Sequence, residues 1–226
     1  MSQLTITSSI TATLAGLVLA ASANANLIVN GGFEEAPTGS PIGGGSGWNY
    51  YDADDINGWD GDNLELWIGR NPDAYEGDYH AELNAHGQNG ENWVISQTFD
   101  TVIGQTYDLF FAYSARRGDA DSSSEVFEVE VNGTIAGTTD DFSYTIEDHT
   151  KNTWIEFSES FVATSTSSTL SFASIVPYSA TVGNFLDAVS VTADTTPTGQ
   201  SIPEPGSLAL LALGLAGLRL SRKKAK

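Results

Sequence analysis

Short apolar stretches with the composition of β-strands recur along the middle of the chain. Residues 126–131 are one such stretch, and from Phe127 to Val131 apolar and acidic side chains alternate strictly, which predicts a strand with one buried and one solvated face. Eight further stretches are rich in β-branched and aromatic residues: 27–29, 64–68, 79–83, 93–99, 107–113, 154–161, 169–174 and 185–192. None of the intervening stretches has the period of a helix. The pattern predicts an all-β fold, an antiparallel β-sandwich of the jelly-roll type.

Turn residues lie where this pattern requires them. Gly104-Gln105, Asn132-Gly133 and the Thr/Ser-rich residues 164–169 separate predicted strands. The glycine-rich residues 43–47 are predicted to form a flexible surface loop, because neither the Lys-Ser/Thr pair nor the helix of a phosphate-binding loop follows them. Since no internal linker interrupts residues 26–193, they are predicted to form one domain.

Both ends of the chain differ from this domain. Residues 14–21 are apolar and are followed by Ala23-Asn24-Ala25, a small-x-small pattern that signal peptidase accepts. Residues 1–25 are therefore predicted to be a signal peptide, although no Lys or Arg precedes the apolar run.

At the other end, a linker over residues 194–202 leads to a second signal over residues 203–226. Pro203, Glu204 and Pro205 stand before an apolar run, which is short for a membrane helix because a comfortable span takes about 20 residues. Five basic residues follow this run and would hold the terminus in the cytoplasm: Arg219, Arg222, Lys223, Lys224 and Lys226. A short C-terminal transmembrane helix is predicted.

These three elements in this order resemble the PEP-CTERM sorting signal. The resemblance implies that exosortase, a membrane protease, recognises and cuts the signal. It also implies a chain that is exported, anchored transiently in the inner membrane, and then released to the cell surface or the extracellular matrix. An ordinary tail anchor is the alternative, but it leaves the Pro-Glu-Pro unexplained.

Charge narrows the choice of partners. Residues 26–200 contain four basic and 28 acidic residues, a formal net charge of −24, so nucleic acid is excluded as a partner. Divalent cations are more compatible with such a surface. The chain has no cysteine, so the exported domain cannot use disulfides for stability.

Several short motifs within the domain occur in an order that resembles a known family. They are residues 26–34, 58–59, 64–67, 82–84, 95–99, 104–107, 113–116 and 184–191. Together they resemble a galactose-binding-domain-like jelly roll, similar to carbohydrate-binding modules and plant-wall domains that begin with an Asn-Gly-x-Phe-Glu strand. The resemblance spans nearly all of residues 26–192 and implies polysaccharide as the ligand.

The same resemblance implies a structural calcium ion shared between Glu34, at the first strand, and Asp187, near the last. Calcium prefers several hard oxygen ligands, and one ion would join the two ends of the domain. Glu35 could substitute for Glu34 if a bulge exchanged the faces of the strand. The alternative is that both acids are solvated, or that Asp187 caps a turn.

Sugar binding requires flat aromatic rings and polar groups for the hydroxyls. The candidates concentrated in loops and at strand ends include Trp48 and Arg117, and the residues predicted to bind the sugar are Tyr50, Tyr51, Trp59, Trp67 and Arg116. Trp59 and Trp67 could instead fill the core, whereas Tyr50 and Tyr51 lie in a polar segment and are harder to explain as core residues.

No nucleophile motif and no histidine metal-binding motif supports catalysis, so the chain is predicted not to be an enzyme. The first hypothesis is a surface or matrix protein that binds polysaccharide. The second is a structural component of the biofilm matrix without a specific sugar, and the third is a carbohydrate-active hydrolase, which would need a pair of acids at a sugar-facing surface.

Overall fold

The computed structural model describes residues 25–70, 72–85, 93–117, 125–147, 150–177, 179 and 181–195. Residues 1–24 of the predicted signal peptide and all of the predicted sorting signal lie outside these residues. None of the described segments contains a helix long and apolar enough to span a membrane.

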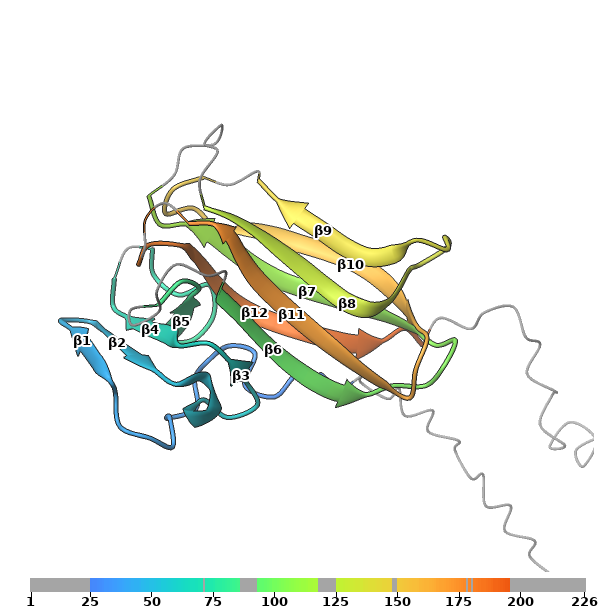
Figure 1. The fold of residues 1–226 in the computed structure, drawn as a ribbon, viewed down its shortest axis with the longest axis horizontal. Helices are drawn as coiled ribbons and strands as arrows, with labels where there is room; N and C mark the ends of the chain where they lie inside the picture. The colour runs from blue at the N-terminus through green and yellow to red at the C-terminus, as the bar shows by residue number, and fades with distance from the viewer. Residues whose placement is uncertain are drawn as a thin grey trace, which may run out of the picture.

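The strands form two packed layers (Figure 1). The first layer has the order β1 (Gly43–Gly45), β2 (Trp48–Tyr51), β4 (Leu64–Ile68), β5 (Tyr79–Glu82), β12 (Asn184–Ala193), β7 (Thr106–Ala115) and β10 (Ile155–Ala163). The second has the order β9 (Asp141–Ile146), β8 (Val126–Ile135), β11 (Ser167–Val176), β6 (Trp93–Asp100) and β3 (Asp60–Gly61). Every pairing between these strands is antiparallel.

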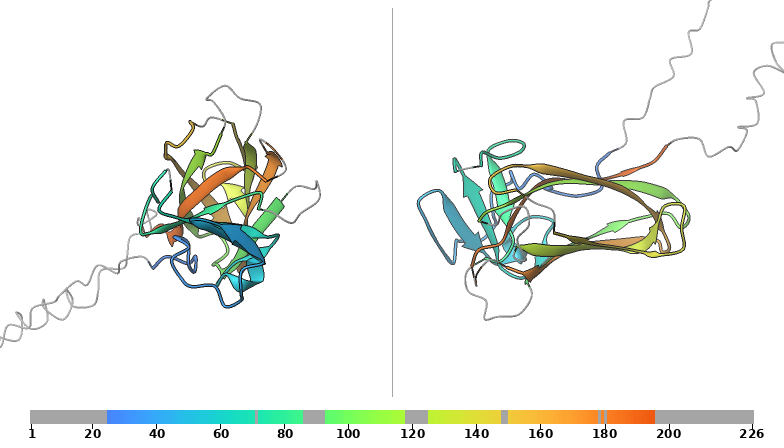
Figure 2. Two further views of the ribbon diagram at one scale, coloured as in Figure 1. Left: turned by 90° about the vertical axis from the view of Figure 1, so that its left-hand side faces the viewer. Right: turned by 90° about the horizontal axis from the view of Figure 1, so that it is seen from above.

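The core lies between the layers (Figure 2). Its largest fully buried side chains include the phenylalanines Phe111, Phe127, Phe161 and Phe172. At residue 27 the chain runs next to the last strand, where the Leu27 N–H donates to the Val191 carbonyl at 2.8 Å. Since all described strands and the core fall between residues 27 and 194, this segment contains a complete sandwich, and the predicted all-β fold is confirmed.

The strict alternation predicted for residues 127–131 is also confirmed, because Phe127, Val129 and Val131 are buried while Glu130 is exposed. The predicted turn at Asn132-Gly133 is wrong. Strand β8 continues to Ile135 through an irregularity in its pairing with β9. A bulge of this kind absorbs turn-forming residues within a strand and therefore hides the strand in the sequence.

Two further predictions at the start of the domain are corrected. Residues 43–47 were predicted to be a flexible loop, but Gly43–Gly45 forms β1, an edge strand paired with β2. Residues 27–29 were predicted to be a strand and belong to none. The Gln97 side chain holds them instead, because its Oε1 accepts from the Val29 N–H at 2.6 Å and its Nε2 donates to the Val29 carbonyl at 3.0 Å.

Candidate functional site

A row of stacked rings crosses the outer face of the first layer. Trp48 on β2 lies directly opposite Trp67 on β4, which lies directly opposite His80 on β5. Residues opposite each other in antiparallel strands point to the same face. The ring centroids of Trp48 and Trp67 are therefore only 6.0 Å apart, and those of Trp67 and His80 6.4 Å, with nearly parallel planes.

Further rings continue this row across the sheet. Phe185 on β12 contacts His80 edge-on at 4.7 Å, and Trp154 covers His80 at 5.5 Å. Tyr75 then bridges Trp154, at 6.2 Å, and Phe110 on β7, at 6.1 Å. We call these seven residues the aromatic face: Trp48, Trp67, His80, Phe185, Trp154, Tyr75 and Phe110.

The aromatic face reaches solvent at both ends and is buried in the middle. Tyr75 is 38% exposed, and Trp48 and Trp154 are half-buried, whereas Trp67, His80 and Phe185 are buried. The buried rings hold the accessible rings in position. A flat ligand could therefore stack on either end without ordering a loop first.

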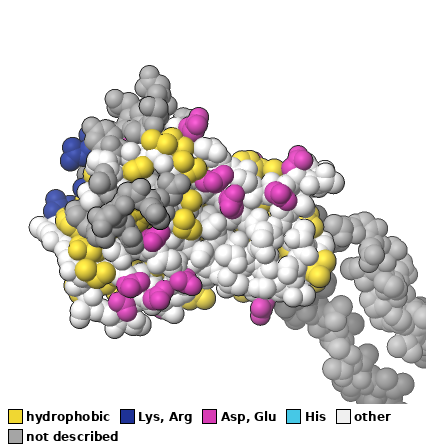
Figure 3. All heavy atoms as spheres, viewed as in Figure 1, with side chains coloured by type: hydrophobic (Ala, Val, Ile, Leu, Met, Phe, Trp, Pro, Cys, Tyr) yellow, Lys and Arg dark blue, Asp and Glu magenta, His cyan; other side chains and the backbone are white. Residues whose placement is uncertain are grey.

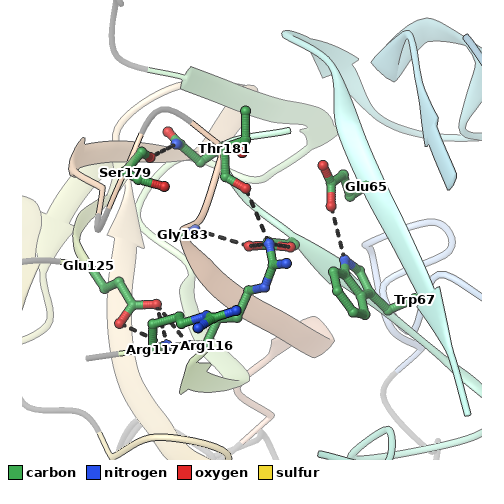
Figure 4. A network of polar contacts seen from close by, with 10 residues as sticks. Glu65, Trp67, Arg116, Arg117, Glu125, Ser179, Thr181 and Gly183 are labelled. Atoms are coloured by element: carbon green, nitrogen blue, oxygen red, sulfur yellow. Dashed lines mark hydrogen bonds and ion pairs between the residues drawn. The ribbon is translucent and has the colours of Figure 1, made fainter. Parts of the chain in front are cut away.

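Arg116 covers the buried middle of the face. Its guanidinium carbon lies 4.6 Å from the centre of the Trp67 ring, a cation–π contact. Its Nη1 donates to both carboxylate oxygens of Glu82, at 2.9 and 3.0 Å, and to the Thr181 carbonyl at 3.1 Å. In Figure 4 Arg116 lies between Trp67 and the turn that contains Thr181 and Gly183.

Two buried carboxyl groups lie beneath this contact. Glu65 and Glu82 are directly opposite on β4 and β5, and neither is exposed. Burial, together with the charge of Glu65, raises the pKa of Glu82 well above its usual value, although Arg116 and the Gly183 N–H act in the opposite direction. Glu65 accepts from the Trp67 indole N–H at 3.2 Å. Both acids are thus engaged within the protein.

A third buried acid fixes the end of β7, from which Arg116 projects. The Glu125 carboxylate accepts from the backbone N–H groups of Arg116 and Arg117 at 2.8 to 3.1 Å. The Glu125 carbonyl in turn accepts from the Asn184 side chain on β12. Figure 4 shows Glu125 to the left of Arg116 and Arg117. The backbone that carries Arg116 is therefore anchored before any ligand binds.

The structure separates the five residues predicted to bind sugar. Tyr50 lies opposite Glu65 and therefore points to the side of the sheet that carries the aromatic face. Trp67 and Arg116 lie on the same side. Tyr51 points to the other face of β2, where with Glu34 it lines a small pocket of about 170 Å³. Trp59 is only 3% exposed, stacks on Phe33 at 5.3 Å, and donates its indole N–H to the Asn30 carbonyl. The alternative of a core role describes Trp59, so its predicted binding role is dropped.

The two residues predicted to bind calcium meet at one segment, residues 75–79. Glu34 Oε1 accepts from the Asp78 and Tyr79 N–H groups, both at 2.8 Å. Asp187 Oδ2 accepts from the Tyr75 and Glu76 N–H groups at 2.8 and 3.2 Å, and its Oδ1 accepts from the N–H of Ala188 at 2.7 Å. Glu34 and Asp187 thus hold the segment that carries Tyr75 through hydrogen bonds to its backbone.

Three of the four carboxylate oxygens of this pair accept amide hydrogens. Across the described segments, no group of three or more His, Asp or Glu side chains is arranged to hold a metal ion. The capping alternative for Asp187 describes its contacts. The shared calcium ion stays a prediction.

Two titrating groups stand out by their burial. Burial lowers the pKa of His80 to about 4, and neither of its ring nitrogens has a hydrogen-bond partner among the described residues. Burial also raises the pKa of Asp187 to about 7, while the three amide N–H groups around it act in the opposite direction. The His80 ring in the middle of the aromatic face is therefore uncharged at neutral pH.

Neither Tyr75 nor Trp154 was selected from the sequence as a candidate binding residue. Tyr75 lies in no strand, and the residues around it in the sequence do not indicate that its backbone N–H donates to Asp187. The Trp154 indole N–H donates to the Asp73 carbonyl at 2.8 Å, which turns its ring over His80. The alternation of β2, β4 and β5 could have revealed the row Trp48–Trp67–His80, but only with the register known.

The second layer offers a contrasting surface. A groove of about 460 Å³ lies over β8, β9 and β11 and is lined by hydroxyl, amide and carboxylate groups, among them Glu130, Asn132, Ser143 and Thr169. Its one aromatic residue, Phe142, is buried. Flat stacking surfaces are therefore concentrated on the first layer.

Together these features define an all-β domain with an aromatic face on its first layer. The chain belongs to the family described as protein of unknown function (DUF642), whose model matches residues 26–192. The PEP-CTERM protein-sorting motif matches residues 201–224, which confirms the predicted sorting signal. This motif implies export, transit through a membrane-anchored form, and processing by exosortase. No curated protein matches the chain.

Solved structures share the β-sandwich at low identity. TmCBM61 in complex with β-1,4-galactotriose is 17% identical, with a TM-score of 0.45, and the match covers 75% of this chain and 99% of that one. A family 4 carbohydrate-binding module is 18% identical, with a TM-score of 0.42, over 74% and 99%. The C-terminal family 22 module of Clostridium thermocellum Xyn10B is 17% identical, with a TM-score of 0.42, over 68% and 98%. At these values the structures are no guide to what this domain binds.

Proposed function

We propose that the processed domain binds polysaccharide on its aromatic face, at the cell surface or in the extracellular matrix, without acting on it chemically. The observation that supports this most directly is the continuous run of rings from Trp48 to Phe110, with accessible rings at both ends. Sugar rings stack on such surfaces through their apolar faces.

The proposal of a non-catalytic role rests on the acids of this face. Glu65 and Glu82 form the paired carboxyl groups that a hydrolase would need, but neither is exposed. Both oxygens of Glu82 accept from Arg116, and Glu65 accepts from Trp67. A general acid or nucleophile must reach the scissile bond, and these two groups do not.

A glycan array probed with residues 26–200 tests the proposal, since this segment contains the complete sandwich. We expect binding to at least one polysaccharide, and we expect Tyr75→Ala and Trp48→Ala to weaken it by about fivefold each, the range of a lost aromatic stacking contact. Ile103→Ala, at an exposed apolar residue outside the aromatic face, is the matched control and should bind normally.

Binding to no glycan by the wild-type domain would reject this function in favour of a structural matrix component without a specific sugar. Release of shorter oligosaccharides from a bound glycan would reject the non-catalytic role. Equal losses in Tyr75→Ala and Ile103→Ala would place the binding site elsewhere on the domain.

A further inference from the structure

The few basic residues of the domain gather around the aromatic face. Residues 26–200 contain four: Arg70, Arg116, Arg117 and Lys151. Arg70 follows β4 and bonds the Ser46 carbonyl, beside Trp48. Arg116 and Arg117 follow β7, and Lys151 pairs with Ala115 at the end of that strand. In Figure 3 dark blue is confined to the end of the molecule that carries β1 and β2, while magenta is spread over the visible surface.

This placement puts cations on both sides of the row Trp48–Trp67–His80. Arg70 lies where β4 ends, and the other three lie at the opposite end of the first layer's strands, from which Arg116 reaches back over Trp67. Arg70, Arg117 and Lys151 are exposed. Residues 26–200, with a net charge of −24, thus carry all four of their basic side chains at the ends of first-layer strands.

Arg116 adds a directional group to this charge. Every hydrogen bond that it makes through its side chain to the described residues uses Nη1. Its Nε and Nη2 groups therefore have no partner among those residues, and 20% of the side chain is exposed. The edge formed by Nε and Nη2 matches the two oxygens of a carboxylate.

From these observations we infer that the ligand is an acidic polysaccharide, whose sugars carry carboxylate groups. This inference rests on the proposed function and adds the class of ligand. A sugar stacked at the Trp48 end places its carboxylate toward the free edge of Arg116, and neighbouring sugars meet Arg70 on one side and Arg117 or Lys151 on the other.

The high negative charge of the domain does not oppose this at contact distance. At physiological ionic strength the screening length is about 8 Å, so remote acids contribute little compared with the exposed cations Arg70, Arg117 and Lys151. Arg116 is partly neutralised by Glu82 and contributes mainly through the hydrogen bonds of its free edge.

Glu65, Glu82 and Glu125 are buried and accept hydrogen bonds from Trp67, Arg116 and Arg117. At the other end of the aromatic face the exposed Glu156 accepts from the Tyr75 hydroxyl at 2.7 Å, so the acidic sugar is assigned to the Trp48 end.

Polygalacturonate and its fully methyl-esterified form test the inference, because esterification removes the charge and keeps the backbone. Affinities for residues 26–200 are measured in 0.15 M salt with chelator, which prevents calcium cross-linking of the polymer. We expect the acid form to bind at least about tenfold more tightly, and the difference to shrink in 0.5 M salt. Arg117→Gln and Lys151→Gln should each weaken binding of the acid form about two- to fivefold and leave the ester unaffected.

Val102→Glu is the matched control. It changes the net charge by the same single unit at an exposed residue of the β6–β7 loop and should bind both forms normally. Binding of the ester, or of a polymer of amino sugars, as tightly as the acid form would overturn the inference and leave the proposed function intact. Binding of neither form, together with no binding to any neutral or basic glycan, would overturn the proposed function itself.

Discussion

Asp187 offers the sharpest test of how the aromatic face is held. Its side chain is fully buried, and it accepts three backbone N–H groups, from Tyr75, Glu76 and Ala188. Asp187→Ala leaves these donors without an acceptor. A hydrogen bond to a charged group contributes about 1.5–3 kcal/mol, and because the three share one carboxylate their effects do not add fully. We therefore expect a loss of about 3–5 kcal/mol in the free energy of unfolding.

In a domain of this size each kcal/mol shifts the melting temperature by roughly 2–4 °C, so Asp187→Ala should melt roughly 6–20 °C below the wild type. Calorimetry of residues 26–200 measures the shift, and limited proteolysis should show new cleavage near Tyr75, because the segment loses its anchor.

Two matched variants sharpen the result. Glu34→Ala removes two similar bonds to the same segment from an exposed carboxylate, and it should lower the melting temperature by less than half as much. Asp187→Asn keeps the volume but places an amide donor against at least one N–H group, and it should be intermediate. A shift below 2 °C for Asp187→Ala, or equal shifts for Asp187→Ala and Glu34→Ala, would refute the account of Asp187 as the main anchor.

Three further predictions follow from the site and the sorting signal. Since burial lowers the pKa of His80 from 6.5 to about 4, the wild type should lose stability as the pH falls through that range, because the unfolded chain binds the proton more readily. His80→Phe should remove this loss in melting curves measured at several pH values, and it should be as stable as the wild type or more stable at pH 7. If Glu34 and Asp187 share calcium, chelator should lower the melting temperature of the wild type but not of Glu34→Ala, and indifference of the wild type would reject the ion. Glu204→Ala should block processing in a host with exosortase, seen as a larger, membrane-retained product by immunoblotting; normal processing would contradict the role of the motif.

Much of the sandwich could be predicted because each strand has an alternating pattern of apolar and polar residues in its own sequence. The limits of β6, β7, β10 and β12 lie within two residues of those expected, since period-two burial and β-branched composition are local properties. Strand β9 was missed. Its residues, Asp141–Ile146, alternate polar with apolar side chains, and Phe142 and Ile146 are buried. The local period-two signal was therefore present in the sequence and was overlooked.

The candidate site was only partly visible in the sequence. Tyr50, Trp67 and Arg116 were selected as side chains suited to a sugar. The register of β2 and β4 places Tyr50 and Trp67 on one face, and Arg116 contacts Trp67 on that face from the end of β7. Trp59 has the same chemistry, but its place between Phe33 and Phe172 makes it a core residue. Residue type states what a side chain can do, whereas burial decides whether it meets a ligand.

The sequence by itself determined the sorting motif, the acidic charge and the all-β class, because each depends on neighbouring residues or on composition. Three features arise only in the folded chain. Trp48, Trp67 and His80 form one row, and Asp187 accepts a hydrogen bond from the backbone of Tyr75, 112 positions away. The four basic residues lie at the strand ends on either side of this row. These contacts join residues far apart in the chain. They are fixed by strand register and by the need of buried polar groups for partners, which no local pattern records.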